Sequence, residues 1–156
     1  MLKMVMKERV LMRWFFILFW VGVIFIFTCT SSFNGLIESG LIQFHWDNKP
    51  LFSELLSPFP GNLSMNLLLQ KSGHFFVFFI LAALLQTRLR SKLFILTLSV
   101  SYAVLTEILQ LYFTRDGRLF DIGFDIAGVL FALAIGSLFT VRKTATAKAS
   151  PRGEAR

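Results

Sequence analysis

The sequence predicts an all-α membrane protein with four transmembrane helices and with both ends of the chain in the cytoplasm. Three observations support this fold class. Of the 156 residues, 55% are hydrophobic and only 16% are charged, and the mean hydropathy is +0.67, whereas soluble domains usually carry about 25% charged residues. The apolar residues are concentrated in four segments of about 20 residues, the length that spans a bilayer core. Most basic residues lie in the parts of the chain that would share one side of the membrane.

Each of the four segments is predicted to be a spanning helix. The first contains no charge, and the second carries Lys71 and His74 in its first half. The third is interrupted only by Glu107 and Gln110, and the fourth begins with two aspartates and is uncharged after them. The predicted helices cover residues 14–33, 67–85, 93–113 and 121–140. With their connections they form a single domain over residues 1–141.

The distribution of Lys and Arg predicts the orientation. Cytoplasmic flanks of membrane helices carry an excess of these residues. Twelve of the 16 basic residues lie in the N-terminal segment, the second connection or the C-terminal tail, and the other four are Lys49, Lys71, Arg115 and Arg118. Both ends are therefore predicted to be inside, and the connections after the first and third helices are predicted to face outside.

The first outer connection is long and contains an apolar run at residues 50–56. Its spacing suits a short amphipathic helix at the membrane interface, with Pro50 in the first turn and Pro58 and Pro60 ending it.

The tail, residues 142–156, is basic and rich in Ala and Thr, a composition typical of disorder. Because its charges are explained by topology, no nucleic-acid partner is predicted. The single Cys29 excludes an intramolecular disulfide and a cysteine-based zinc site.

Six polar side chains lie close to the outer ends of the second, third and fourth helices. Ionisable residues inside membrane segments are costly and are functional candidates by default. At about 1.5 Å of rise per residue, all six fall within about 10 Å of the outer boundary. They are Lys71, His74, Glu107, Gln110, Asp121 and Asp125. Arg115 and Arg118, in the short connection between the third and fourth helices, lie over this cluster.

Helical spacing places these residues in pairs on single faces, because residues three or four positions apart are neighbours. The same faces continue inward with small residues, which let helices approach closely: Gly128, Ala132 and Gly136 on the fourth helix, and Ser99 and Ala103 on the third. The polar residues should therefore converge inside the bundle. Two interpretations remain open: an ion-paired network that fixes helix order, and a pocket with a chemical function.

These residues resemble the VanZ-like family of small bacterial membrane proteins. The likeness rests on Lys71-x-x-His74, on Glu107-Ile108-Leu109-Gln110, and on Arg115 six residues before Asp121, followed by Asp125 and Gly128. It covers about residues 65–137, with Thr30-Ser31-Ser32 as a weaker match. The family often has Asn at the position of Asp125. The resemblance implies a multi-pass protein of the bacterial cytoplasmic membrane, and a link to resistance against teicoplanin, a lipid-tailed glycopeptide antibiotic.

Three functions are compatible with the sequence. The first is a binding protein that acts at the cell envelope on or against lipid-tailed glycopeptides or envelope lipids, with membrane lipids as partners. The second is a membrane-embedded, metal-assisted hydrolase or transferase of lipid head groups. In it His74, Glu107 and Asp121 are the catalytic candidates, and these three with Asp125 are the candidate metal ligands. The third is a proton or ion transporter, which the lack of charge in the cytoplasmic halves of these helices disfavours. Cofactor and oligomeric state are not predicted.

Overall fold

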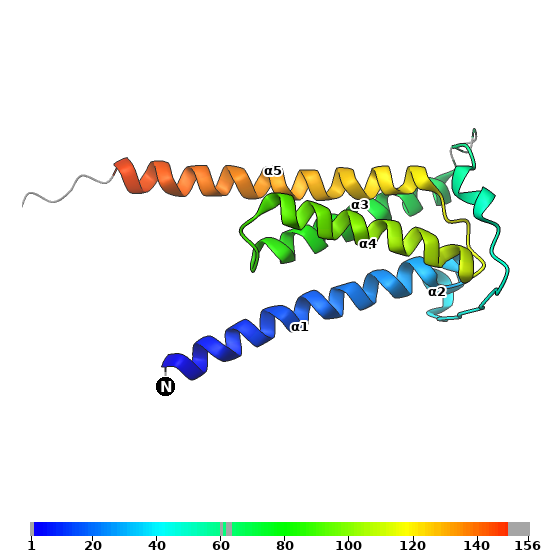
Figure 1. The fold of residues 1–156 in the computed structure, drawn as a ribbon, viewed down its shortest axis with the longest axis horizontal. Helices are drawn as coiled ribbons and strands as arrows, with labels where there is room; N and C mark the ends of the chain where they lie inside the picture. The colour runs from blue at the N-terminus through cyan, green and yellow to red at the C-terminus, as the bar shows by residue number, and fades with distance from the viewer. Residues whose placement is uncertain (1, 60, 62–63, 150–156) are drawn as a thin grey trace, which may run out of the picture.

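The computed structural model describes residues 2–59, 61 and 64–149, and it is helical (Figure 1). Four of the described helices are long and apolar enough to cross a membrane. They are α1 (Leu2–Cys29), α3 (Met65–Gln86), α4 (Lys92–Tyr112) and α5 (Leu119–Ala149). The predicted all-helical fold with four candidate membrane spans is therefore confirmed.

The first helix ends earlier than predicted, at Cys29 instead of residue 33. The chain leaves the helix because Ser31 N–H donates to the Gln43 carbonyl, and because Ser32 caps a new helix by accepting from Gly35 N–H. This helix, α2 (Phe33–Ser39), was not predicted from the sequence. It ends at Gly40, whose φ of 67° lies in the left-handed region that favours glycine.

The predicted amphipathic helix at residues 50–56 is a short 3-10 helix, η1 (Phe52–Leu56), none of whose residues is buried. The Phe52 ring meets the Tyr112 ring at the end of α4, and Trp46 stacks on the same tyrosine. Aromatic contacts thus attach the long connection to the C-terminal end of α4.

Serine caps begin the next two spans. Ser64 Oγ accepts from Leu67 N–H at the start of α3, and Ser91 Oγ accepts from Phe94 N–H at the start of α4. The last helix, α5, continues beyond residue 140 to Ala149. Residues 142–149 of the predicted disordered tail are therefore helical, and residues 150–156 lie outside the described residues.

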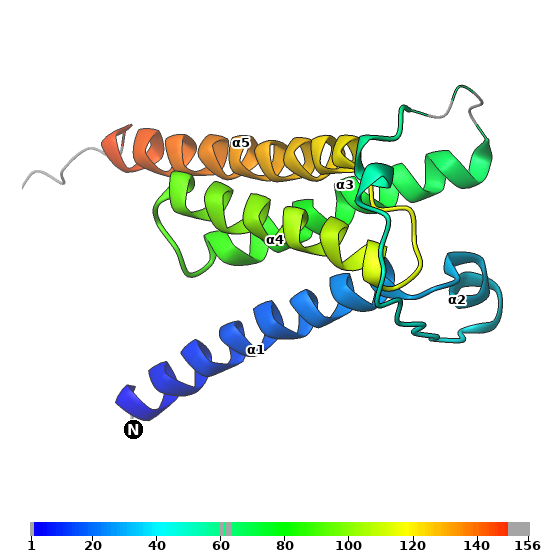
Figure 2. The same cartoon turned by 45° about the vertical axis from the view of Figure 1, so that its right-hand side comes forward.

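Helices α3, α4 and α5 lie side by side, whereas α1 diverges from them toward its N-terminus (Figure 1, Figure 2). The most extensive contact joins α3 and α5, which run parallel, and α1 contacts α3 and α4. Near the middle of α1, Trp20 Nε1–H donates to the Val77 carbonyl, and Tyr102 O–H donates to the Val21 carbonyl. The buried core between the helices includes Ile24, Phe78, Leu81, Ala82, Ile95, Ala103 and Val129.

The close contact between α3 and α5 depends on glycine. A Cβ atom at Gly128 would collide with the backbone carbonyl of Phe75. Ala132 is buried one turn further along, and its carbonyl accepts from Gln86 Nε2–H. The small face of α5 therefore points into the bundle, as predicted, and the helix that it meets there is α3.

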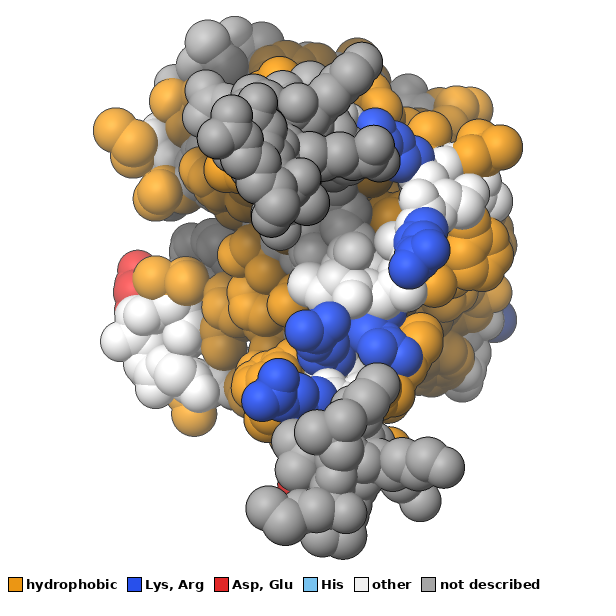
Figure 3. Space-filling view, turned by 90° about the vertical axis from the view of Figure 1, so that its left-hand side faces the viewer, with side chains coloured by type: hydrophobic (Ala, Val, Ile, Leu, Met, Phe, Trp, Pro, Cys, Tyr) orange, Lys and Arg blue, Asp and Glu red, His pale blue; other side chains and the backbone are white. Residues whose placement is uncertain are grey.

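Both described ends of the chain and the α3–α4 connection lie at one end of the bundle (Figure 1). There Arg13 donates to the Thr87 carbonyl, and Lys92 donates to Ser137 Oγ. Figure 3 looks onto this end and shows several Lys and Arg side chains gathered on it. The polar residues of the predicted cluster lie toward the opposite end.

Candidate functional site

The first pair of the cluster is a buried ion pair between α3 and α5. Lys71 Nζ donates to Asp121 Oδ1 at 2.5 Å, and the two side chains are 6% and 1% exposed. The ammonium also lies over the Phe120 ring, 4.7 Å from its centroid. The positive charge of Lys71 is thus balanced by the Asp121 carboxylate, which accepts the lysine's hydrogen bond at Oδ1.

The second pair lies one helical turn deeper. His74 Nδ1 is 3.0 Å from Asp125 Oδ1 and 3.8 Å from Glu107 Oε1. Both carboxylates are fully buried, and His74 is 6% exposed. Because α3 and α5 are parallel, the i, i+3 spacing on α3 matches the i, i+4 spacing on α5, and the two pairs follow one another in register. Glu107 joins the second pair from α4.

Glu107 is held from two directions. Gln110 Nε2–H donates to Oε1 at 3.0 Å, and the backbone N–H of Arg118 donates to Oε2 at 2.7 Å. The approach of the α4–α5 connection to this glutamate depends on Gly117, where a Cβ atom would collide with the Glu107 carbonyl. The connection therefore fixes the orientation of the carboxylate.

The two arginines above the cluster behave differently. Arg115 donates to the Thr30 carbonyl at 3.1 Å and to the Phe27 carbonyl at 3.4 Å, at the end of α1. Burial lowers the pKa of its guanidinium, and the negative charge of Glu107 acts in the opposite direction. Arg118 directs its guanidinium to Asp116, which is largely exposed. Arg118 thus contacts the cluster through its backbone N–H and not through its guanidinium.

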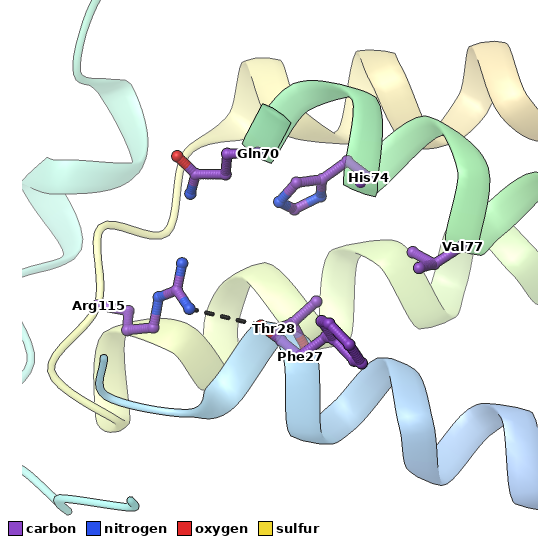
Figure 4. Close-up of a pocket in the computed structure, with 7 residues that line it drawn as sticks. Phe27, Thr28, Gln70, His74, Val77 and Arg115 are labelled. Carbon is purple, nitrogen blue, oxygen red and sulfur yellow. Dashed lines mark hydrogen bonds between the residues drawn. The ribbon is translucent and has the colours of Figure 1, made fainter. Parts of the chain in front are cut away.

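A small, partly open pocket with a cavity volume of about 40 Å³ lies beside the cluster, between α1 and α3. In Figure 4, Gln70 and His74 extend from α3 and Arg115 lies across from them, while Phe27 and Val77 form the other end. The remaining lining residues are Thr28 and Gly73. The pocket therefore has a polar end with a cation and an apolar end.

Among the residues predicted from the sequence, Lys71, His74, Glu107, Gln110, Asp121 and Asp125 lie together, and Arg115 borders the pocket. Sequence reasoning missed the contribution of α1, which supplies Phe27 and Thr28, and also missed Gln70 and Gly73. A signal was present at Gly73, because a glycine next to His74 in a helix predicts open space or close packing.

The comparisons with known proteins agree with this architecture. Residues 13–140 match the model of the VanZ/LLP1 family. The chain is also similar to the uncharacterized membrane protein YwnJ of Bacillus subtilis, with 34% identity over 111 residues, which is 70% of this chain and 79% of that protein. No solved structure matches the chain significantly. The matched residues include most of the first span, all of the other three and the polar cluster, and the chain belongs to the VanZ/LLP1 family of multi-pass membrane proteins.

Proposed function

We propose that this protein is a binding protein of the bacterial cytoplasmic membrane that takes up an amphiphile with an acyl chain and an anionic head group. The pocket between α1 and α3 carries this proposal, because cationic and apolar ends in one cavity match the two parts of such a molecule. The head group would lie against Arg115, Gln70 and His74, and the chain would follow Phe27 and Val77. An arginine recognises phosphate or carboxylate through charge-assisted hydrogen bonds.

The location of the pocket supports a ligand of the outer leaflet. The ends of the chain and the Lys- and Arg-rich α3–α4 connection lie at one end of the bundle, and the pocket lies toward the other. From the positive-inside rule we infer that the pocket lies on the outer side. Phospholipids of that leaflet and lipid-tailed glycopeptides such as teicoplanin share the required chemistry.

The orientation is tested by labelling single cysteines in intact cells with a membrane-impermeant maleimide. Cysteine at exposed positions 48 or 116 should react in intact cells, whereas cysteine at 9 or 90 should react only after lysis. The native Cys29 is fully buried, so the unsubstituted protein is the control. Labelling at position 90 from outside would contradict the orientation, and with it an outer-leaflet ligand.

The binding function is tested by filling the pocket. A Cβ atom at Gly73 meets no atom within 4 Å, and Gly73 lines the pocket, so the side chain of Gly73→Leu should extend into it. Binding should become at least about tenfold weaker, or 1.4 kcal/mol, while the helix itself gains propensity. Affinity is measured on purified protein with phosphatidylglycerol and with teicoplanin. Phosphatidylcholine and vancomycin, which lacks an acyl chain, serve as comparison ligands.

Gly123→Leu is the matched control. Gly123 lies in α5, is exposed, and also has no atom within 4 Å of an added Cβ. This variant should bind as the unsubstituted protein does. Preference for phosphatidylglycerol over teicoplanin would identify an envelope lipid as the ligand, and the reverse would identify the antibiotic. Unchanged binding of both in Gly73→Leu, or no binding by the unsubstituted protein, would contradict the proposal.

A further inference from the structure

One set of side chains beside the pocket has a geometry that lipid binding does not explain. His74 on α3, Glu107 on α4 and Asp125 on α5 each direct one ligand atom to a common point, and these three atoms lie within 4.8 Å of one another. All three residues are buried, and the two carboxylates have no exposed surface. Three helices thus supply one nitrogen and two oxygen atoms to one place.

The spacing of these atoms fits a coordinated cation. Zinc binds imidazole nitrogen and carboxylate oxygen at about 2.0–2.2 Å, which places neighbouring ligand atoms of a tetrahedral site about 3.3 Å apart. The observed distances from His74 Nδ1, 3.0 Å to Asp125 Oδ1 and 3.8 Å to Glu107 Oε1, lie on either side of this value. Small movements of side chains would bring the three atoms into one coordination sphere.

The hydrogen bonding of the carboxylates gives independent support for a bound cation. Asp125 Oδ2 is buried and has no hydrogen-bond partner among the described residues. An unsatisfied buried carboxylate oxygen is costly unless a proton or a cation compensates it. Glu107, in contrast, is oriented by Gln110 and by the backbone of Arg118. Metal ligands are commonly fixed by such outer hydrogen bonds.

The balance of charges in the cluster also favours a bound cation. Three buried carboxylates are accompanied by one lysine, and Lys71 is directed to Asp121 rather than to the other two. The Arg115 guanidinium donates to carbonyls at the end of α1. Glu107 and Asp125 together carry two negative charges when both are ionised. A divalent cation between them would balance these two charges, and neutral His74 would complete the ligand set.

We propose that His74, Glu107 and Asp125 form a binding site for a divalent transition cation such as Zn²⁺ or Mn²⁺. Asp121 lies outside this group of three, and its Oδ1 accepts from Lys71 Nζ. Its Oδ2, like that of Asp125, is buried without a hydrogen-bond partner among the described residues. Imidazole with two carboxylates is a donor set typical of such ions. Three protein ligands leave coordination positions open, and His74 also lines the pocket, so a bound water or a ligand head group can reach the ion.

The test is the metal content and metal affinity of the full-length protein, purified in detergent without chelator. Elemental analysis should give about one equivalent of metal per chain. After chelation, Zn²⁺ should bind again and raise the melting temperature. Added Co²⁺ should give visible d–d absorption bands that Zn²⁺ abolishes, which reports on the ligand set in the unsubstituted protein without the need for any variant.

His74→Ala, Glu107→Gln and Asp125→Ala should each weaken Zn²⁺ binding by more than about tenfold. Asp116→Asn, in the adjacent connection, should not, because this exposed carboxylate contacts Arg118 and not the cluster. Folding of each variant is checked by monodispersity and circular dichroism. If variants fail to fold, the Co²⁺ spectrum of the unsubstituted protein decides.

Two results would overturn the proposal. One is a folded, unsubstituted protein that takes up neither Zn²⁺ nor Mn²⁺ at concentrations that saturate ordinary zinc proteins, in which case a protonated His74 balances the carboxylates. The other is full affinity in folded His74→Ala, which would place the metal elsewhere. Neither result depends on ligand binding at the pocket, because metal content is measured without an amphiphile.

Discussion

Asp121→Asn is expected to lower the free energy of unfolding by about 3–5 kcal/mol, the usual cost of removing one partner of a buried ion pair. Lys71 Nζ lies 2.5 Å from Asp121 Oδ1 and its side chain is 6% exposed, so the lysine would be left as a buried cation without its counter-charge. The amide can accept a hydrogen bond but carries no charge. Unfolding of the purified protein by SDS in mixed micelles measures the change.

The double substitution Lys71→Met with Asp121→Leu is the informative control. Replacing a buried ion pair by apolar residues of similar size is often neutral or stabilising, so the double variant should recover most of the loss. Asp116→Asn, at an exposed carboxylate, should change the stability by no more than about 0.5 kcal/mol. A similarly small effect of Asp121→Asn would show that the Lys71–Asp121 pair is not desolvated.

Gly128→Leu is expected to destabilise the bundle by at least about 3 kcal/mol, the upper end of the range for overpacked cores. The obstacle is the backbone of α3 at Phe75 and Phe79, which cannot turn away as a flexible side chain can. The two helices would have to separate, and the Lys71–Asp121 and His74–Asp125 pairs would separate with them. Thermal unfolding and SDS titration both measure this loss.

Gly123→Leu again provides the comparison within the same helix. Its added side chain enters open space, so the gain in helix propensity, up to about 1 kcal/mol, should dominate. Equal stability of Gly128→Leu and Gly123→Leu would mean that α3 and α5 do not approach as closely as the structure shows.

Much of this architecture could be predicted because the bilayer imposes strong rules on sequence. A spanning segment must be apolar and long, so the prediction located three of the four candidate membrane spans to within two residues: Leu67–Gln86, Lys92–Tyr112 and Leu119–Phe139. The exact ends of the helices were harder to predict. The end of α1 at Cys29 is determined by hydrogen bonds from Ser31 and Thr30 to Gln43, which is distant in the sequence.

The depth and the faces of the polar residues could also be derived, because helical rise and periodicity are nearly invariant. Which cluster residue pairs with which could not be derived from the sequence. Lys71 selects Asp121 and His74 selects Asp125 because of the relative height of α3 and α5, which is set where Gly128 meets the backbone of α3. The pocket was not predictable either, because it arises from the angle between α1 and the other spans.

The parallel pairing of α3 and α5 has a consequence for the order of events during synthesis. Lys71 and His74 leave the ribosome about 50 residues before Asp121 and Asp125, their partners in the finished protein. Until α5 is made, α3 carries an uncompensated ammonium group, and α3 and α4 are less apolar than α1 and α5. The cost of placing such a group in hydrocarbon falls only when the carboxylates of α5 arrive. We therefore expect the last three helices to enter the lipid as a group, after the more apolar α1 has been integrated on its own.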